Sequence, residues 1–247
     1  MTPPAGYTRL ARGRCRATVR DDLVPALGPW LLRVPLAPPA GAVAIPGGRG
    51  AAFRLELAGG ERAVVRFGRR GGAVARIVAD RYVGLRPRPW RELDVALRAR
   101  ARGAPVAPVL AAGVQGFGVY RSVVVMAEVP DATTLLDAVG GAGTAAAREA
   151  IARRAAGAIA RLHAAGVVHA DLNLSNILVS RDQVAVVDLD RARLRRGPLG
   201  ARARARSLRR LGRSLARLDP MRRVIEEPVV RAFHDAYRTA AEGACGS

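Results

Sequence analysis

The amino-acid sequence predicts an α+β chain of two lobes, a small N-terminal lobe of five strands and one helix and a mainly helical C-terminal lobe. Short apolar or alternating runs separated by glycine turns fill residues 41–129, a pattern typical of strands. Longer helical patterns with two short apolar runs fill residues 130–247. Residues 1–40 mix proline, glycine and arginine without a clear period, and we expect them to form an extended lead-in.

The composition restricts the chemistry and the partners of the chain. The formal net charge is +21, and all 41 basic residues are arginine, a bias that suggests coding composition more than selection at each site. Without lysine, the chain can form neither a lysine Schiff base nor a G-K-[ST] phosphate loop. The charge favours polyanionic partners such as nucleic acid, an anionic lipid surface or a phosphorylated substrate.

The cysteine and hydropathy patterns bear on location. Cys15 and Cys245 lie near opposite ends and have neither disulfide nor metal spacing, which favours a reduced, intracellular protein. The three histidines come without a C-x-x-C motif, so we expect no zinc site. No apolar run reaches the roughly 18 residues of a membrane span, so the sequence predicts a soluble or peripheral protein.

Hydrophobic periodicity predicts the elements of both lobes. In the first lobe a hairpin turn is expected at residues 58–61, and a helix over residues 89–102, where Trp90, Leu93 and Leu97 share one face. In the second lobe Pro220 is expected to break an arginine-rich helical region. The remaining expected strands are residues 42–45, 51–57, 63–67, 109–114, 119–129, 177–179 and 184–187, and the remaining helices are residues 133–139 and 144–164.

One motif carries the most specific chemistry. Residues 169–176 read H-x-D-x-x-x-x-N, and an apolar strand then leads into Asp188, as phosphoryl transfer from a nucleotide requires. Asp171 is the candidate base for the acceptor hydroxyl, and Asn176 and Asp188 are candidate ligands of Mg²⁺ on the phosphates of ATP. His169 is expected to brace the backbone. Four matched elements in order favour a protein-kinase-like bilobal fold over a set of unrelated caps and turns.

The N-terminal lobe supplies weaker matches to the same fold. Gly48 and Gly50 lie in a glycine loop between two expected strands, where backbone amides can approach phosphates. Arg66 stands where protein kinases carry the lysine of V-A-I-K, and Glu92 on the next helix is its candidate partner. The alternatives are an ordinary glycine turn and an unrelated arginine and glutamate on a solvated face.

Some residues depart from the protein-kinase pattern. Asn173 stands two positions after the candidate base, where protein kinases have lysine, and Asp188 is followed by Leu189 and Asp190 instead of phenylalanine and glycine. No A-P-E motif is present. These departures favour a small-molecule or glycolipid acceptor over a protein acceptor.

The chain resembles the bacterial lipopolysaccharide core kinases, and is most similar to the 3-deoxy-D-manno-octulosonic acid (Kdo) kinases. The similarity is specific in the catalytic segment and in the Arg-Arg-Gly-Gly stretch, and looser elsewhere between about residues 45 and 218. The segments that carry it are residues 65–67, 69–72, 80–82, 91–93, 163–173, 176–178, 188–191 and 208–215.

The resemblance implies ATP-dependent phosphorylation of a Kdo hydroxyl on the lipid A-linked core, at the cytoplasmic face of the inner membrane or in the cytoplasm. The resemblance implies that Asp171 is the base and that Asn176 and Asp188 bind the metal. An arginine at position 66 is compatible with the family pattern. Leu189 and Gly68 depart from the family pattern and bear on the acceptor. The alternatives are a kinase for another core sugar such as heptose or for a small polar drug, and a catalytically inactive module that binds nucleotide or an anionic surface.

An arginine-rich segment follows the motif. Residues 191–223 hold thirteen arginines and one acid, Asp219, so a basic surface for Kdo carboxylate, lipid A phosphates or an anionic membrane is expected. The alternative is compositional drift on a solvated helix face. Since the segment lacks interleaved aromatic residues, no specific nucleic-acid binding is expected.

Overall fold

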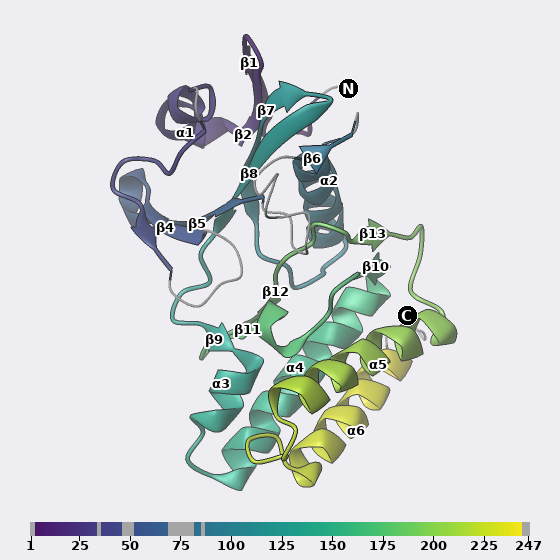
Figure 1. Cartoon of the computed structure of the whole chain (residues 1–247). Coiled ribbons are helices and arrows are strands. Elements are labelled where there is room, and N and C mark those ends of the chain that lie inside the picture. Colours follow the sequence, from purple (N-terminus) through teal and green to yellow (C-terminus); the bar gives the residue numbers. More distant parts are fainter. Residues whose placement is uncertain (1–2, 34–35, 46–51, 69–81, 85–86, 244–247) are drawn as a thin grey trace. The chain divides into compact units, whose positions relative to one another are not determined.

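The computed structural model describes residues 3–33, 36–45, 52–68, 82–84 and 87–243 (Figure 1). The chain forms two compact units. The first comprises Met1–Asp94 and Pro108–Glu128, and the second comprises Val95–Ala107 and Val129–Ser247. None of the helices in these ranges combines the length and the apolar character that crossing a bilayer requires.

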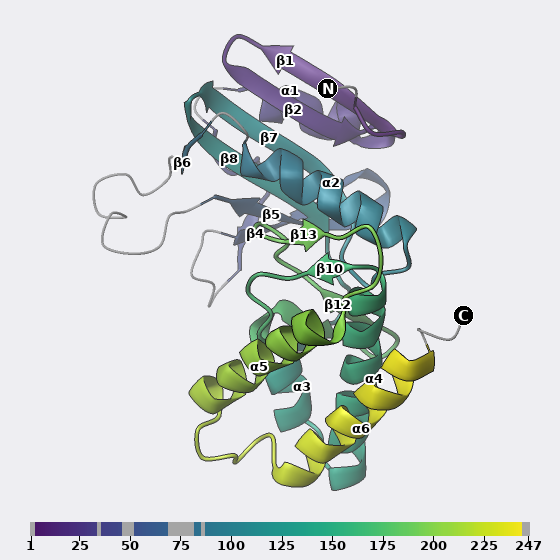
Figure 2. The same ribbon diagram turned by 90° about the vertical axis from the view of Figure 1, so that its right-hand side faces the viewer.

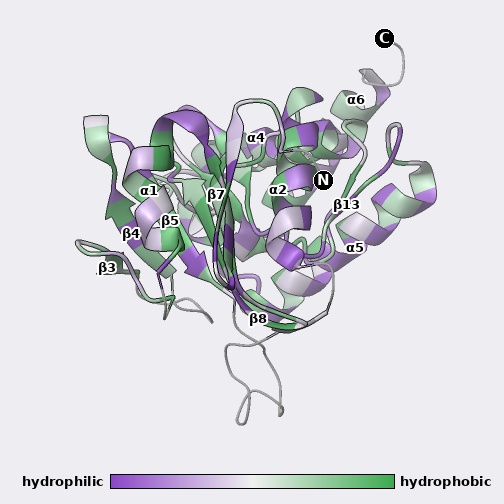
Figure 3. Ribbon diagram, turned by 90° about the horizontal axis from the view of Figure 1, so that it is seen from above, coloured by the Kyte–Doolittle hydropathy of each residue, from purple (hydrophilic) through white to green (hydrophobic). Residues whose placement is uncertain are grey.

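The first unit is built on an antiparallel sheet of eight strands among the described residues, in the order β1-β2-β7-β8-β5-β4-β3 with β6 paired to β8. Its central strands β7 and β8 carry mostly apolar residues (Figure 3). The strands are β1 (Tyr7–Arg12), β2 (Cys15–Arg20), β3 (Val43–Ala44), β4 (Ala52–Glu56), β5 (Arg62–Phe67), β6 (Tyr82–Val83), β7 (Val109–Phe117) and β8 (Val119–Ala127).

The expectation of an extended lead-in over residues 1–40 is wrong in the ranges that the structure describes. Strand β2 pairs with β7 in register from Cys15 opposite Gln115 to Val19 opposite Ala111, and helix α1 (Val24–Leu31) covers β2. The alternating Cys15, Ala17 and Val19 are fully buried. Pairing with a strand about 100 residues away stabilises this segment. The sheet therefore has more strands than the five predicted, and the unit has a second helix, α1, in addition to the predicted one.

The core of the first unit lies between α1 and the sheet. Aromatic edges line part of it, because Phe67 meets both Trp30 and Phe53 edge-on. Helix α2 (Arg88–Ala101) confirms the helix expected over residues 89–102. Buried members of this core are Ala17, Val19, Leu23, Leu27, Leu31, Leu36, Leu55, Leu57, Ala63, Val65, Leu110, Ala111, Val123 and Val125.

The second unit is mainly helical, and α4 packs along α6 (Figure 2). Thr134 and Thr144 cap the first two helices by accepting hydrogen bonds from Asp137 N and Ala147 N. The helices are α3 (Leu135–Gly140), α4 (Ala145–Ala164), α5 (Ala201–Leu218) and α6 (Glu227–Gly243); the strands are β9 (Thr133–Thr134), β10 (Val167–Val168), β11 (Ile177–Val179), β12 (Val184–Val186) and β13 (Arg193–Leu194).

The turn after α5 is closed by a buried carboxylate. Asp219 accepts hydrogen bonds from the backbone N–H groups of Arg223, Val224 and Ile225 at 2.7–3.0 Å. Burial acts to raise the pKa of Asp219, but these donors outweigh it and the pKa lies below its usual value. The helix break expected at Pro220 therefore falls in a turn that Asp219 organises.

A buried histidine joins three helices of the second unit. His163 on α4 is hydrogen-bonded through Nδ1 to the Tyr237 hydroxyl on α6 at 2.7 Å, and through Nε2 to Ser207 Oγ on α5 at 2.9 Å. Burial, assisted by the charge of Arg204, lowers the pKa of His163 to about 4. The neutral ring therefore belongs to the helical core.

We expect mild acid to destabilise the second unit. The unfolded chain takes up a proton at the ordinary histidine pKa of about 6.5, while folded His163 resists protonation until about pH 4. The contribution of His163 to the free energy of unfolding is therefore fully present above pH 6.5 and is lost as the pH falls toward 4. The free energy of unfolding changes by up to about 1.4 kcal/mol per pH unit in this range. Urea unfolding followed by circular dichroism between pH 4.5 and 7.5 measures it.

The matched variants are His163→Gln and His234→Gln, since His234 lies exposed on α6. The His163→Gln variant should have a flatter dependence of the free energy of unfolding on pH, with a remaining slope that comes from buried His169. The His234→Gln variant should show the wild-type dependence. Identical profiles for wild type and His163→Gln would contradict the assignment.

Candidate active site

The segment between β10 and β11 is anchored to the core by buried residues. Leu172 and Leu174 are buried while Asp171 is exposed between His169 and these anchors. The backbone N–H of Leu174 donates to Ser214 Oγ on α5 at 3.1 Å. The loop therefore presents the Asp171 carboxylate to solvent from a backbone fastened to the core.

His169 connects this loop to the strand that precedes Asp188. Its Nδ1 accepts the backbone N–H of Asp171 at 3.2 Å, so its Nε2 carries the proton and donates to the carbonyl of Val187 at 3.0 Å. The ring is buried, and burial is the main cause that lowers its pKa. Both ring nitrogens are occupied, as expected for a bracing residue.

Asn176 and Asp188 lie at the same end of the β11–β12 hairpin. The strands are antiparallel, with Ile177 opposite Val186, and the N–H of Val187 donates to the carbonyl of Asn176 at 3.0 Å. The Asn176 side-chain amide donates to the carbonyl of Asp171 at 2.9 Å. The structure thus brings the three predicted residues of this unit into one hydrogen-bonded segment.

Asp188 has a left-handed backbone conformation, with φ of 64°. Such a conformation is unfavourable for most L-residues and is tolerated best by aspartate and asparagine among those with a side chain. Strand β12 ends at Val186, two residues before Asp188. The left-handed backbone of Asp188 therefore lies outside the alternation of the strand.

Asn173, which the protein-kinase pattern marks only as a departure from lysine, is a positioning residue. Its Oδ1 accepts the backbone N–H groups of Ser175 and Asn176 at 2.9 and 3.1 Å. Its Nδ2 donates to the carbonyl of Asp171 at 3.1 Å. An asparagine followed by a short polar turn is a capping signal, and that signal was available in the sequence.

In the first unit, Arg66 and Glu92 form an ion pair between Arg66 Nη2 and Glu92 Oε1. Arg66 lies on β5 and Glu92 on α2, and Glu92 is only 3% exposed. A carboxylate this deeply buried requires a compensating cation. The structure therefore brings these two predicted residues together, whereas Gly48 and Gly50 lie outside the described residues.

The residues around Asp188 suit a magnesium ion that is shared with phosphates. A dedicated protein cage for a metal would contain three or more His, Cys, Asp or Glu side chains with metal-binding geometry. The described ranges hold no such group. Mg²⁺ instead takes one or two carboxylates together with phosphate oxygens and water. Because Asn176 Nδ2 is committed to Asp171, the Asn176 Oδ1 atom is the oxygen that this side chain can offer.

Comparison with known proteins gives consistent results. The model of the "Lipopolysaccharide kinase (Kdo/WaaP) family" matches residues 42–237. A 3-deoxy-D-manno-octulosonic acid kinase of Xylella fastidiosa (strain 9a5c) is 37% identical over 197 residues, covering 78% of this chain and 76% of that protein. The enzyme of the same name from Xanthomonas euvesicatoria pv. vesicatoria is 36% identical over 201 residues, covering 78% of each.

Two solved structures share the fold. WaaP in complex with acyl carrier protein has a TM-score of 0.53 at 20% identity, covering 80% of this chain and 78% of that one. Amicoumacin kinase hAmiN in complex with AMP-PNP, Ca²⁺ and Ami has a TM-score of 0.52 at 12% identity, covering 89% and 78%. The expected protein-kinase-like α+β fold is thereby confirmed.

We expect Asn173→Ala to loosen the loop around Asp171 without unfolding the chain. The substitution removes the acceptor of two amides and one donor to the Asp171 carbonyl, at a cost of about 1–3 kcal/mol for buried groups left unpaired. Hydrogen exchange at the Ser175 and Asn176 amides should accelerate by about tenfold to a hundredfold. Ser175→Ala, at an exposed position of the same turn, is the control, and equal protection in both variants would refute the positioning role.

Proposed function

The chain belongs to the lipopolysaccharide kinase (Kdo/WaaP) family, and we propose that it transfers the γ-phosphoryl group of ATP to a hydroxyl of Kdo in the lipid A-linked core. Its general activity follows from the family: it is a sugar kinase of lipopolysaccharide core biosynthesis. The observation that supports the detailed proposal best is the hydrogen-bonded loop that joins Asp171, Asn176 and the residue before Asp188.

In the proposed mechanism Asp171 orients the acceptor hydroxyl and receives its proton late in the transfer. Its exposed carboxylate can reach a substrate, and its backbone is held on both sides, by His169 at the N–H and by two asparagine amides at the carbonyl. His169 does not compete for this role, because both of its ring nitrogens bond to backbone groups. Rigid placement of the base lowers the entropic cost of reaching the reactive geometry.

We assign metal binding and phosphate binding to different side chains. Asn176 and Asp188 would hold Mg²⁺, which when bound neutralises charge on the ATP phosphates. Arg66, oriented by buried Glu92, would contact phosphate oxygens through its planar guanidinium, a role in which arginine can replace the lysine of protein kinases. These roles also disfavour an inactive module, since Asp171, Asn176 and Asp188 are all present.

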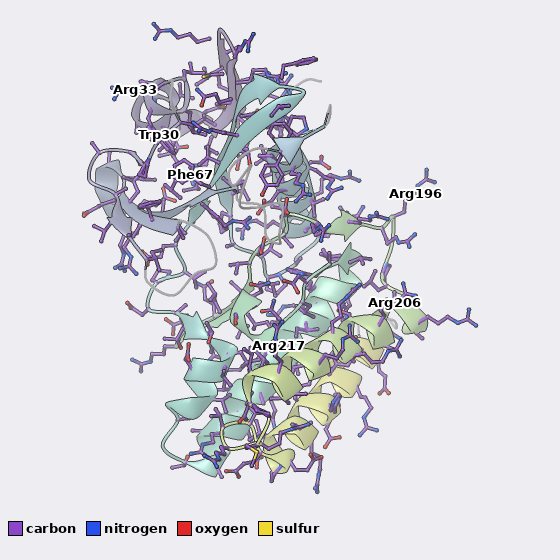
Figure 4. The ribbon with its side chains drawn as sticks, in the orientation of Figure 1. Trp30, Arg33, Phe67, Arg196, Arg206 and Arg217 are labelled. Carbon is purple, nitrogen blue, oxygen red and sulfur yellow. The ribbon has the colours of Figure 1, made fainter. Side chains whose placement is uncertain are left out.

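The arginine segment supports a peripheral location at the cytoplasmic face of the inner membrane. Helix α5 buries Ser207, Leu211, Ser214 and Leu215, and Arg196 and Arg206 project away from the ribbon (Figure 4). Such a basic face suits the phosphates of lipid A and of anionic lipids. The exposed arginines of the α5 face are Arg202, Arg206, Arg209, Arg213 and Arg217.

The first experiment is transfer of labelled phosphate from ATP to Kdo-lipid A, to its deacylated form and to heptosyl acceptors. We expect labelling of the Kdo acceptors, and a rate about 10²- to 10⁴-fold lower for Asp171→Asn, because the base is removed. The free energy of unfolding should change by less than about 0.5 kcal/mol, since the side chain is exposed. Asp182→Asn, in the exposed turn between β11 and β12, is the matched control. Full turnover by Asp171→Asn would exclude the proposed base.

The second experiment tests the metal assignment through nucleotide binding alone. Asp188→Asn should remove most of the increase in nucleotide affinity that Mg²⁺ produces, because a neutral amide attracts the cation less strongly than a carboxylate does. Calorimetry with a non-hydrolysable ATP analogue, with and without Mg²⁺, measures the difference. An unchanged magnesium-dependent gain in the variant would assign the ion to other ligands.

A further inference from the structure

The turn between β7 and β8 exposes an aromatic side chain. Phe117 is 74% exposed and Val119, opposite it in the ladder, is 47% exposed. Phe117 is therefore the most exposed large apolar side chain among the described residues. Phenylalanine is among the residue types that are most often fully buried, and here it is exposed beside a second exposed apolar side chain.

The tip is held in place by the neighbouring hairpin. The N–H of Gly116 donates to the carbonyl of Arg14 at 3.0 Å, and Arg16 Nη2 donates to the carbonyl of Gly116 at 3.1 Å. Gly116 has a φ of 113°, and a Cβ there would lie 2.3 Å from the carbonyl oxygen of Val119. The close crossing that only glycine permits thus fixes the backbone at the tip of the hairpin, where β7 ends at Phe117.

Arginines surround this apolar tip. The turns of β1–β2 and β7–β8 lie at the same end of the sheet (Figure 2), since Cys15 pairs with Gln115. Arg12, at the end of β1, and Arg14, in the turn that follows, are exposed, and the Arg16 guanidinium lies 5.8 Å from the centre of the Phe117 ring.

The two ends of β2 differ in charge. Among the described residues, no acidic side chain pairs with Arg12, Arg14 or Arg16, whereas Arg20 at the opposite end pairs with Asp22 and Glu61. The end that carries the exposed phenylalanine is therefore the end at which, within the described ranges, the arginines have no acidic partner.

We propose that the paired hairpin tips, comprising Arg12, Arg14, Arg16, Phe117 and Val119, form an interfacial anchor for an anionic lipid surface. The apolar side chains enter the boundary between headgroups and acyl chains, and the guanidinium groups contact lipid phosphates. A hairpin tip that carries an exposed aromatic side chain, next to a hairpin that carries exposed arginines, matches this layered chemistry. The anchor lies in the first unit and is distinct from the α5 arginine face, which lies in the second.

The test is co-sedimentation of the full chain with vesicles of phosphatidylcholine alone or with phosphatidylglycerol. We expect binding to the anionic vesicles to weaken about tenfold in Phe117→Ser, from lost apolar burial, and similarly in the double variant Arg12→Gln, Arg14→Gln, with salt weakening the wild type as well. Val43→Ser is the matched control, since Val43 is 65% exposed on β3 of the same sheet and its loss should leave binding unchanged.

A second measurement reports insertion directly. Phe117→Trp should be quenched by brominated acyl chains in anionic vesicles. Wild-type affinity in Phe117→Ser, equal losses in Phe117→Ser and Val43→Ser, or a Phe117→Trp signal that brominated lipid does not quench would each overturn the proposal. Retention of binding in Phe117→Ser together with loss in an Arg209→Gln, Arg213→Gln variant would place the contact on the α5 arginine face instead.

Phosphorylation of the deacylated, water-soluble acceptor separates the anchor from the kinase. It should proceed at the wild-type rate in Phe117→Ser. A variant that loses vesicle binding and keeps this activity supports the anchor, whereas loss of both would mean that the substitution damages the fold and would refute a role confined to the tip.

Discussion

The candidate site depends on the backbone of one residue, Val187. Its N–H donates to the carbonyl of Asn176, and its carbonyl accepts the Nε2 proton of His169. These two bonds tie the end of β12 to both ends of the loop that carries Asp171. Since a strand register can shift only by breaking such bonds, the position of Asp188 relative to Asp171 follows from them.

Burial gives two histidines structural roles. His163 and His169 are both 2% exposed and both have lowered pKa values. In the core a neutral imidazole is a bifunctional connector, because one nitrogen donates and the other accepts. His163 joins three helices and His169 joins loop to strand, so acid should damage structure and catalytic geometry together.

In this chain arginine alone provides the cationic side chains for ion pairs and hydrogen bonds, a role that lysine also fills in other proteins. Arg66 compensates buried Glu92, and Arg102 donates to the carbonyls of Ala165 and Arg195. Each guanidinium offers several donors in a fixed plane, which allows one side chain to satisfy two backbone acceptors. Compositional bias explains why no lysine occurs, but it does not follow that every arginine lies on the surface without a structural role.

Spacing and short-range alternation in the sequence encode the motif from His169 to Asp188 and the hairpin within it, because these features are local. The sequence also placed Arg66 and Glu92 as partners. It did not reveal β1, β2 and α1, whose order depends on pairing with β7 far along the chain, nor the capping role of Asn173. Tertiary structure alone decided that Phe117 is exposed while Glu92 is buried, because burial depends on which distant segments cover a side chain and not on its chemical type.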